Sequence, residues 1–568
     1  MIDPRAPVTS PVTRRRFVQG VAATAALGAF GTWPARLLAT TGAQTELRGT
    51  EFDLEIAELP VNFTGRASMA TAVNGQVPAP VLHIREGDAI SLRVTNRLSE
   101  PTAVHWHGLL VPPEMDGVPG ISFPGIAAGE TFTYRFTLRQ SGTHWYHAHT
   151  LHEQTGLYGA IVVEPRVVAP LRTDRDYTVL LSDWTDEAPL QVYLNLKKMG
   201  SYYNYGLPTT GDVLKDLSRL GVAGAHKRRV MWNRARMSPT DYSDVSGATY
   251  TYLMNGTTPA SNWTGIARAG ERVRLRFIGA GTATYFDVRI PGLKLNVVAT
   301  DGQDVAPVEV DEVRIGPGET YDVIVQMPDD RAYTIFAQTM DRTGYARGTL
   351  APRAGMQADV PRPDAPVWLS ETDMMGAMAA MAPMVDGATG AASMPKKTRH
   401  ARSEYGPGVD MRVDSPRSNL DDPGPNLRNN GRRVLTYADL RTPGGSIDTR
   451  PPGREIELHL TGNMERFEWS FDGVKFSDAK PIHFRSGERL RVILANDTNM
   501  IHPMHLHGMW MELESEGGAF QVRKHTITVQ PAQRISFGVT ADAPGRWAFH
   551  CHLLYHMAAG MFREVVVA

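Results

Sequence analysis

Three stretches of the chain alternate apolar and polar residues directly after a glycine turn, the pattern of a half-buried β-strand. They follow Gly87, Gly270 and Gly487. A second strand-like pattern follows each one, and these second patterns begin at Gly129, Gly318 and Ala532. A β-unit that occurs three times, with many Gly and Pro turns between strands, predicts an all-β protein built from three β-sandwich domains.

The pattern also predicts where these domains begin and end. We expect a leader at 1–45, domains at 46–166, 167–360 and 431–568, and a Met-rich and polar linker at 361–430. Within the second domain, residues 186–232 lose the strand pattern. Val213–Leu220 has apolar residues three and four positions apart, so we expect a partly helical insertion there.

Histidines recur at fixed distances from the repeated turns. His105 and His505 lie 18 residues after Gly87 and Gly487, and His147 and His550 lie 18 residues after Gly129 and Ala532. Each is followed two positions later by a second histidine: His107, His507, His149 and His552. Side chains two apart on a strand share a face. We therefore expect the first and last domains to contribute half-sites on which eight histidines converge.

The middle copy of the repeat lacks these histidines. Val288, Ile290, Phe336 and Gln338 lie near the corresponding places. The second domain is thus expected to hold no metal ligands.

Cys551 is the only cysteine in the chain, and it lies between His550 and His552. His556 and Met561 follow it, and His502 precedes it in an upstream motif. One thiolate, two imidazoles and a distant thioether form the ligand set of a blue-copper site. Because neighbouring strand residues face opposite ways, His550 and His552 would face a second metal site, and one peptide would join the two.

Other polar residues near these motifs have more than one interpretation. His144 and His152 flank the second histidine pair, and we expect hydrogen-bonding or surface roles for them rather than metal ligation. Asp116 is either a turn residue or a carboxylate that orients ligands and donates protons. Glu512, Glu514 and Glu516 alternate along one strand and are expected at a solvated edge.

Charge and the N-terminus narrow the possible partners and location. Fifty-nine basic and sixty acidic residues nearly cancel, which argues against a nucleic-acid partner. Arg14, Arg15 and Arg16 precede an apolar run, Val18–Phe30, that is too short to span a bilayer comfortably. We expect a twin-arginine export signal and a periplasmic protein without a stable membrane span; a membrane anchor or a disordered leader is the alternative.

Methionines gather near the start of the linker: Met374, Met375, Met378, Met381, Met384 and Met394. Thioethers favour Cu(I), so these residues could form an additional cuprous site. The alternative is a flexible linker whose methionines have no role.

The four motifs together resemble those of the multicopper oxidases: His105–Gly108, His147–His149, His502–Gly508 and His550–Met561. The leader, the methionines, Tyr252–Gly256 and Leu460–Arg466 resemble, more narrowly, the periplasmic copper-resistance protein A family. This resemblance implies three cupredoxin-like Greek-key domains, four coppers and an oxidase that uses O2.

The resemblance also implies which residues hold copper. A type 1 copper would take His502, Cys551, His556 and axial Met561, and a type 2 copper would take His105 and His505. A type 3 pair would take the remaining six histidines: His107, His147, His149, His507, His550 and His552.

The implied reaction oxidises a reductant at type 1 copper, passes electrons through Cys551 to His550 and His552, and reduces O2 to water. Some relatives have an acidic proton donor directly after the last type 1 histidine, where this chain has Met557. Asp116 matches the other carboxylate of such relatives. We expect oxidation of Cu(I) in copper tolerance; the alternatives are a laccase-like oxidase of phenols or aromatic amines, and a periplasmic protein that sequesters copper.

Overall fold

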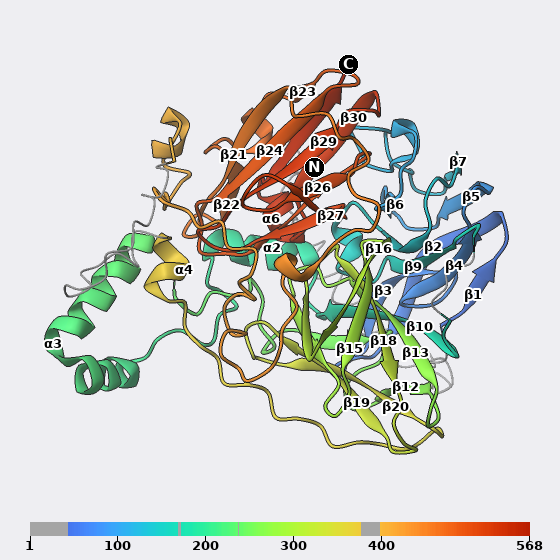
Figure 1. The fold of residues 1–568 in the computed structure, drawn as a ribbon, viewed down its shortest axis with the longest axis horizontal. Helices are drawn as coiled ribbons and strands as arrows, with labels where there is room; N and C mark the ends of the chain where they lie inside the picture. Colours follow the sequence, from blue (N-terminus) through green and yellow to red (C-terminus); the bar gives the residue numbers. More distant parts are fainter. Residues whose placement is uncertain (1–43, 168–171, 237, 377–397) are drawn as a thin grey trace, which may run out of the picture.

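The residues that the structure describes form six β-sheets, which come in three pairs along the sequence (Figure 1). The structure is a computed structural model, and it describes residues 44–167, 172–236, 238–376 and 398–568. In Figure 1 the first pair is blue, the second is green to yellow, and the third is orange to red. The predicted all-β fold class, with three sandwiches, is confirmed.

The first pair of sheets lies in the N-terminal part of the chain. Its four-stranded sheet has the order β3 (Ser68–Val73), β2 (Glu51–Val61), β5 (Ala89–Asn96), β7 (Thr131–Thr137). Its five-stranded sheet has the order β1 (Glu46–Arg48), β4 (Ala79–Arg85), β9 (Tyr158–Glu164), β8 (Gly142–His147), β6 (His105–His107). The histidine strand β6 therefore lies at an edge of its sheet.

The second and third pairs repeat one arrangement. The second has β11 (Thr251–Met254), β10 (Arg175–Trp184), β13 (Arg272–Gly279), β18 (Thr320–Gln326), β15 (Leu295–Thr300), β16 (Gln303–Val310) in one sheet. Its other sheet has β12 (Trp263–Ile266), β20 (Tyr345–Ala351), β19 (Tyr333–Thr339), β14 (Phe286–Arg289), β17 (Glu312–Ile315).

The third pair has β22 (Glu468–Phe471), β21 (Arg454–Asn463), β24 (Arg489–Asn496), β29 (Arg534–Thr540), β26 (Met511–Glu514), β27 (Phe520–Lys524) in one sheet. Its other sheet has β23 (Ile482–Phe484), β31 (Phe562–Val567), β30 (Gly545–Cys551), β25 (His502–Leu506), β28 (Thr526–Val529). Successive strands occupy the same places in both pairs, as the repeated spacing predicts.

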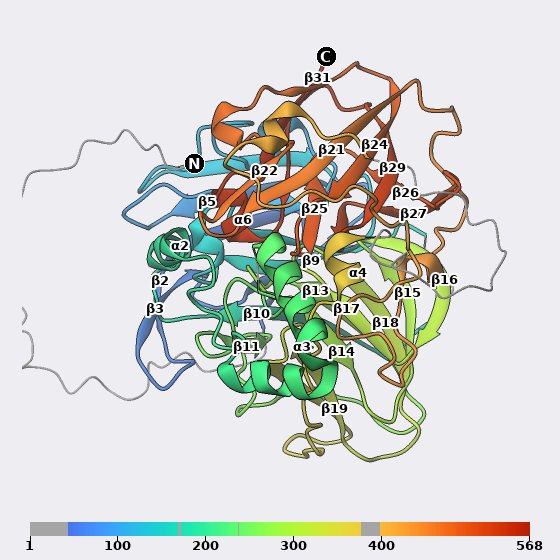
Figure 2. The same cartoon turned by 90° about the vertical axis from the view of Figure 1, so that its left-hand side faces the viewer.

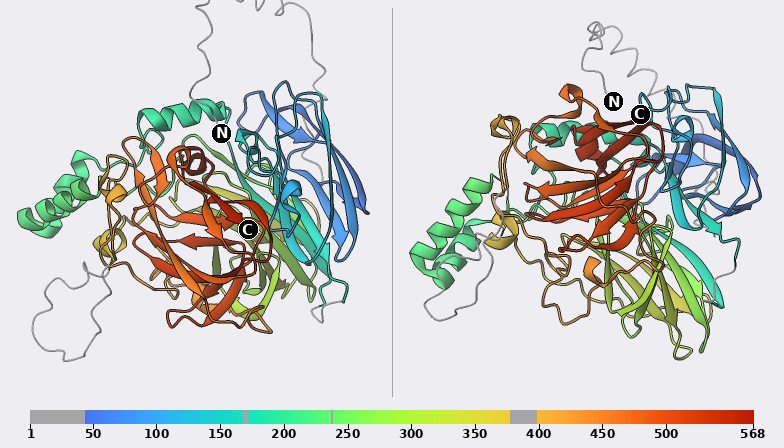
Figure 3. Two further views of the ribbon diagram at one scale, coloured as in Figure 1. Left: turned by 90° about the horizontal axis from the view of Figure 1, so that it is seen from above. Right: turned by 45° about the horizontal axis from the view of Figure 1, so that its top comes forward.

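Helices interrupt this β-framework in the second part of the chain. The predicted insertion contains α2 (Pro189–Lys198) and α3 (Thr210–Ala235), and α3 kinks at Gly221, whose φ is 67°. Figure 2 shows α3 in front of the strands, and Figure 3 shows it standing out from the body of the molecule. Shorter helices are α4 (Glu371–Met375) and α6 (Leu554–Ala558). Among the described residues, no helix combines the length and apolarity that crossing a membrane requires.

The described part of the predicted linker packs closely against its neighbours. Met411, Val413 and Leu427 are buried, and the N–H of Arg417 donates to the carbonyl of Ala532 at 2.8 Å. Burial of apolar side chains on folding stabilises such irregular segments as it does strands.

The expectation of a solvated edge at Glu512 and Glu514 is wrong. Both carboxylates are buried, and they lie 2.6 Å from guanidinium nitrogens of Arg489 and Arg491 on β24. Buried carboxylates of this kind need such partners. Glu516, beyond the end of β26, is exposed.

Candidate metal centre

Neighbouring strands of the first and third pairs bring the eight histidines together. On β6 and β8, His105 lies opposite His147, and on β25 and β30, His505 lies opposite His550 in the same register. His149 lies two residues after the end of β8, and His552 lies one residue after the end of β30. All eight rings are buried.

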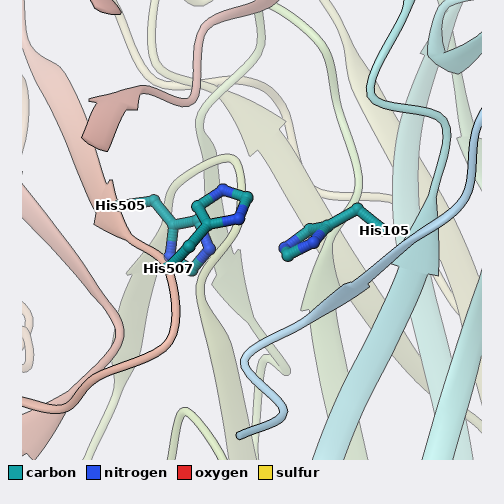
Figure 4. Close-up of side chains that lie close together, drawn as sticks. All are labelled: His105, His505 and His507. Atoms are coloured by element: carbon teal, nitrogen blue, oxygen red, sulfur yellow. The ribbon is translucent and has the colours of Figure 1, made fainter. Parts of the chain in front are cut away.

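The ring nitrogens form three groups in which the atoms lie within 4.8 Å of one another. The groups are His105, His505 and His507; His107, His147 and His552; and His149, His507 and His550. Figure 4 shows the first group, with the ring of His105 directed towards the rings of His505 and His507 from the opposite side. Each group combines residues from both ends of the chain.

Several nitrogens of these rings lack a hydrogen-bond partner in the described part of the chain and are free to bind metal. Within the described residues, Nε2 of His105, His147 and His505 and both nitrogens of His107 and His552 have no hydrogen-bond partner. Unpartnered buried polar atoms are costly, and a metal ion would satisfy them.

The burial of these histidines also sets their protonation. Burial, followed by the neighbouring imidazoles, lowers the pKa of His107, His147 and His507 far below the ordinary value. Burial lowers the pKa of His550 to about 4. These four imidazoles are therefore neutral near pH 7, which is the form that ligates metal.

Oxygen acceptors fix the direction of several rings. Nδ1–H of His507 donates to Oδ2 of Asp116 at 2.8 Å, and Nδ1–H of His147 donates to Oε2 of Glu153 at 3.0 Å. Nδ1–H of His105 donates to the carbonyl of Asp116 at 2.7 Å. A proton held on Nδ1 leaves the Nε2 lone pair for a metal.

Glu153 was not predicted from the sequence to be part of the site. It ends the 3₁₀ turn η3 (Leu151–Glu153), and its carboxylate is buried beside His147. Its only sequence signal is its place six residues after His147.

Replacing Glu153 with glutamine should weaken metal binding at this centre. A carboxylate behind a ligating histidine raises its basicity and holds its direction, and losing one typically costs about 10- to 100-fold in metal affinity. Titration of the metal-free protein, followed by metal analysis after dialysis, measures the change. Glu100→Gln is the matched control, because Glu100 contacts the non-cluster histidine His152 at 2.9 Å; equal metal retention in both variants would contradict this role of Glu153.

A separate group surrounds Cys551. Its Sγ lies 3.6 Å from Nδ1 of His502 and 3.8 Å from Nδ1 of His556, and the two Nδ1 atoms are 3.2 Å apart. Met561 is fully buried, and its N–H donates to the carbonyl of His556 at 3.0 Å. Burial raises the pKa of the Cys551 thiol well above its ordinary value. A bound cation would be needed to stabilise the thiolate at neutral pH.

The far nitrogens of these two histidines are also held. Nε2 of His502 lies 2.7 Å from the Thr498 hydroxyl, and Nε2 of His556 lies 3.1 Å from a carboxylate oxygen of Asp244. Both contacts direct Nδ1 towards the sulfur. Asp244 lies after the helical insertion, in the domain expected to hold no metal ligands, and no sequence motif marks it.

The remaining histidines near the centre differ in role. Nε2 of His144 lies 3.2 Å from the carbonyl of Ser141, and His152 contacts Glu100, so both have hydrogen-bonding partners as expected. His525, which belongs to no motif, forms a further group with His107 and His505. Burial lowers the pKa of His525 to about 3.

Family models described as multicopper oxidase match residues 55–167, 225–355 and 449–568. The chain is 52% identical to a copper resistance protein A homolog of Pseudomonas syringae pv. tomato, over 98% of this chain and 99% of that protein. It is 51% identical to copper resistance protein A of Escherichia coli over the same shares of each. It is also 30% identical to the multicopper oxidase MmcO of Mycobacterium tuberculosis, over 85% of this chain and 80% of that protein.

Solved structures share the fold at low sequence identity. Fet3p, a multicopper oxidase that functions in iron import, has a TM-score of 0.64 at 18% identity, covering 92% of this chain and 90% of that one. The laccase from Botrytis aclada has a TM-score of 0.62 at 19% identity, covering 95% of this chain and 91% of that one.

Proposed function

Because this chain belongs to the multicopper oxidase family, we propose that it oxidises Cu(I) with O2 and so contributes to copper tolerance. The observation that carries the proposal is the strand β30, where Cys551 belongs to one ligand group and its neighbour His550 to another. One peptide bond thus joins a site for electron entry to a site for O2. The relatives named copper resistance protein A, which match almost the full length, support the role in tolerance.

The proposal assigns four coppers. His502, Cys551, His556 and Met561 would hold the type 1 copper, and His105 and His505 would hold the type 2 copper. Two triads would hold the type 3 pair: His107, His147 and His552, and His149, His507 and His550. The grouping of ring nitrogens supports this division, because each triad converges separately. The proposed domains, 46–166, 167–360 and 431–568, place ligands only in the first and last.

When bound, copper supplies the one-electron redox steps and the reduction of O2 to water. The chain holds the ligands in place and supplies protons. Asp116 holds His507 through Oδ2, while its Oδ1 has no hydrogen-bond partner among the described residues. This second oxygen can carry a proton towards the O2 site. Met557 has no group to do so, and we propose Asp116 as the main donor.

The choice of Cu(I) as the reductant depends on where the methionines lie. Met374 is fully buried in the core and Met375 is half-buried, so neither is an open thioether site. Met378, Met381, Met384 and Met394 lie outside the described residues. We propose that these four, rather than Met374, supply the soft ligands that favour Cu(I).

Deleting residues 377–394 should lower the rate of Cu(I) oxidation severalfold and leave phenol oxidation nearly unchanged. The deletion spares the buried Met374 and removes all four proposed thioether ligands. A variant with leucine at 378, 381, 384 and 394 keeps the length and apolar volume of the segment, so it isolates the thioethers. Oxygen uptake with each reductant is the measurement. Equal losses with both reductants would contradict the cuprous site.

Steady-state oxygen uptake by the wild-type protein tests the wider proposal. Cu(I) and a phenol are compared under matched conditions, and a higher kcat/KM for Cu(I) is expected. A higher value for the phenol would favour the laccase-like alternative, which the laccase relatives make the second candidate. Copper retention without any oxygen uptake would favour sequestration.

The place of action is part of the same proposal. The leader with Arg14, Arg15 and Arg16 lies outside the described residues. We propose twin-arginine export to the periplasm, a route suited to a protein that folds before it crosses the membrane. Retention of the protein in the cytoplasm after these arginines are changed to lysine would support that route.

A further inference from the structure

Four buried side chains form a cluster separate from the copper ligands. His400 lies before the 3₁₀ turn η4 (Arg402–Tyr405), which contains Glu404. His459 lies on β21, and Asp497 follows the end of β24. At most 4% of any of these side chains is exposed. We call this cluster the His–carboxylate quartet.

The quartet is closed by four short contacts. Nδ1 of His400 lies 2.8 Å from Oε2 of Glu404 and 3.3 Å from Oδ2 of Asp497. Nδ1 of His459 lies 2.9 Å from the same oxygen of Glu404 and 2.9 Å from the same oxygen of Asp497. Two nitrogens and two oxygens therefore alternate around a ring of four contacts of 2.8–3.3 Å.

Hydrogen bonds alone cannot satisfy all four contacts of the quartet. Each Nδ1 carries at most one hydrogen, so two hydrogens must be shared among four contacts. A single cation at the centre satisfies all four donors at once. A square with edges near 3 Å has its centre about 2.1 Å from each corner, within the range of about 2.0–2.2 Å typical of zinc bonds to protein nitrogen and oxygen.

The second oxygen of each quartet carboxylate accepts a hydrogen bond from a backbone N–H. Oε1 of Glu404 accepts from the N–H of Ala401 at 2.7 Å, and Oδ1 of Asp497 accepts from the N–H of Val413 at 2.9 Å. These contacts hold the two inner oxygens in position, as second-layer hydrogen bonds do at metal sites.

We propose that the His–carboxylate quartet binds one divalent transition-metal ion, Cu²⁺ foremost. Two imidazoles and two carboxylates suit Cu²⁺ or Zn²⁺, and Cu²⁺ binds such nitrogen and oxygen donors more tightly. The ion ties the segment around His400 to β21 and to the loop that carries Asp497. The next residue, Thr498, contacts the type 1 ligand His502, so the ion also steadies that loop.

The competing arrangement is an ion-pair cluster without metal. Hydrogen bonds to Asp497 and Glu404 raise the pKa of His400 to about 9. Burial opposes protonation of His459, but the same two carboxylates raise its pKa to about 10. Two protonated imidazoles beside two carboxylates carry no net charge, so metal content must decide between the two arrangements.

Metal analysis of the oxidised full-length protein tests the proposal. The wild-type protein should hold one more equivalent of copper or zinc than His400→Gln and His459→Gln, and all three should keep the same blue absorption per chain. His83→Gln is the matched control, because His83 contacts a single carboxylate, that of Glu46 at 3.5 Å; it should keep the wild-type metal content.

A wild-type protein that holds only the four proposed coppers overturns the proposal, even if a quartet variant does not fold. So does a folded His400→Gln with unchanged metal content, whatever its melting temperature. The difference in X-ray absorption between the wild-type protein and folded His400→Gln, taken at the edge of the additional metal, should show only nitrogen and oxygen ligands. A sulfur ligand in that difference would place the ion at methionines or Cys551 and also overturns the assignment.

Discussion

Replacing Cys551 with serine should abolish both the blue absorption and the oxidation of reductant, while copper at the eight histidines should be retained. The thiolate supplies the colour and the strongest bond of the type 1 site. A serine hydroxyl is a far weaker ligand, and His502 and His556 alone do not hold the metal in the same geometry. The substitution changes none of the eight histidines. The pairing of β6 with β8 and of β25 with β30 still holds them in position.

Visible absorption, copper content and oxygen uptake measure these three effects together. Met561→Leu is the matched control, since it removes a buried thioether close to the same site and leaves the thiolate. The control should stay blue. Turnover that persists in Cys551→Ser would contradict electron entry through Cys551.

Changing Asp116 to asparagine should lower turnover about 100-fold at unchanged copper content, the lower end of typical losses for a positioned proton donor. Asparagine can still accept the Nδ1–H of His507 through its amide oxygen, so the ring keeps its direction. It cannot carry a proton on the second oxygen. Asp116→Ala, which also removes the contact to His507, should lose copper as well as activity.

The comparison of these two variants separates proton supply from ligand positioning. Oxygen uptake and copper content are measured for both, and the rate in H2O is compared with that in D2O. Wild-type turnover in Asp116→Asn would show that another group supplies the protons.

Regular strand geometry made much of the site predictable from the sequence. A side-chain period of two and equal distances from the repeated turns predicted that His105 and His147, and His505 and His550, occupy matching positions. The structure pairs both directly across neighbouring strands. In the middle repeat the offset is slightly different, because Arg289 rather than Val288 lies opposite Phe336.

Contacts that depend on tertiary packing could not be predicted in this way. Glu153 and Asp244 reach the ligands from a turn and from a loop after the insertion, where no periodic pattern exists. His525 lies on no histidine motif, and only the docking of β25 beside β28 brings it towards His505. Glu512 and Glu514 show the reverse case: their alternation suggested a solvated face, but arginines of β24 cover them.

The division of the three histidine groups between the two ends of the chain links copper binding to assembly. None of the three groups can form until the third sandwich, which carries β25 and β30, has docked beside the N-terminal sandwich. Any ion that binds only the docked form favours docking by mass action, by about 4 kcal/mol at a thousandfold excess over its dissociation constant. Removal of bound metal should therefore loosen the first sandwich from the third, and metal loading of the histidine groups should be one of the last events in the maturation of the protein.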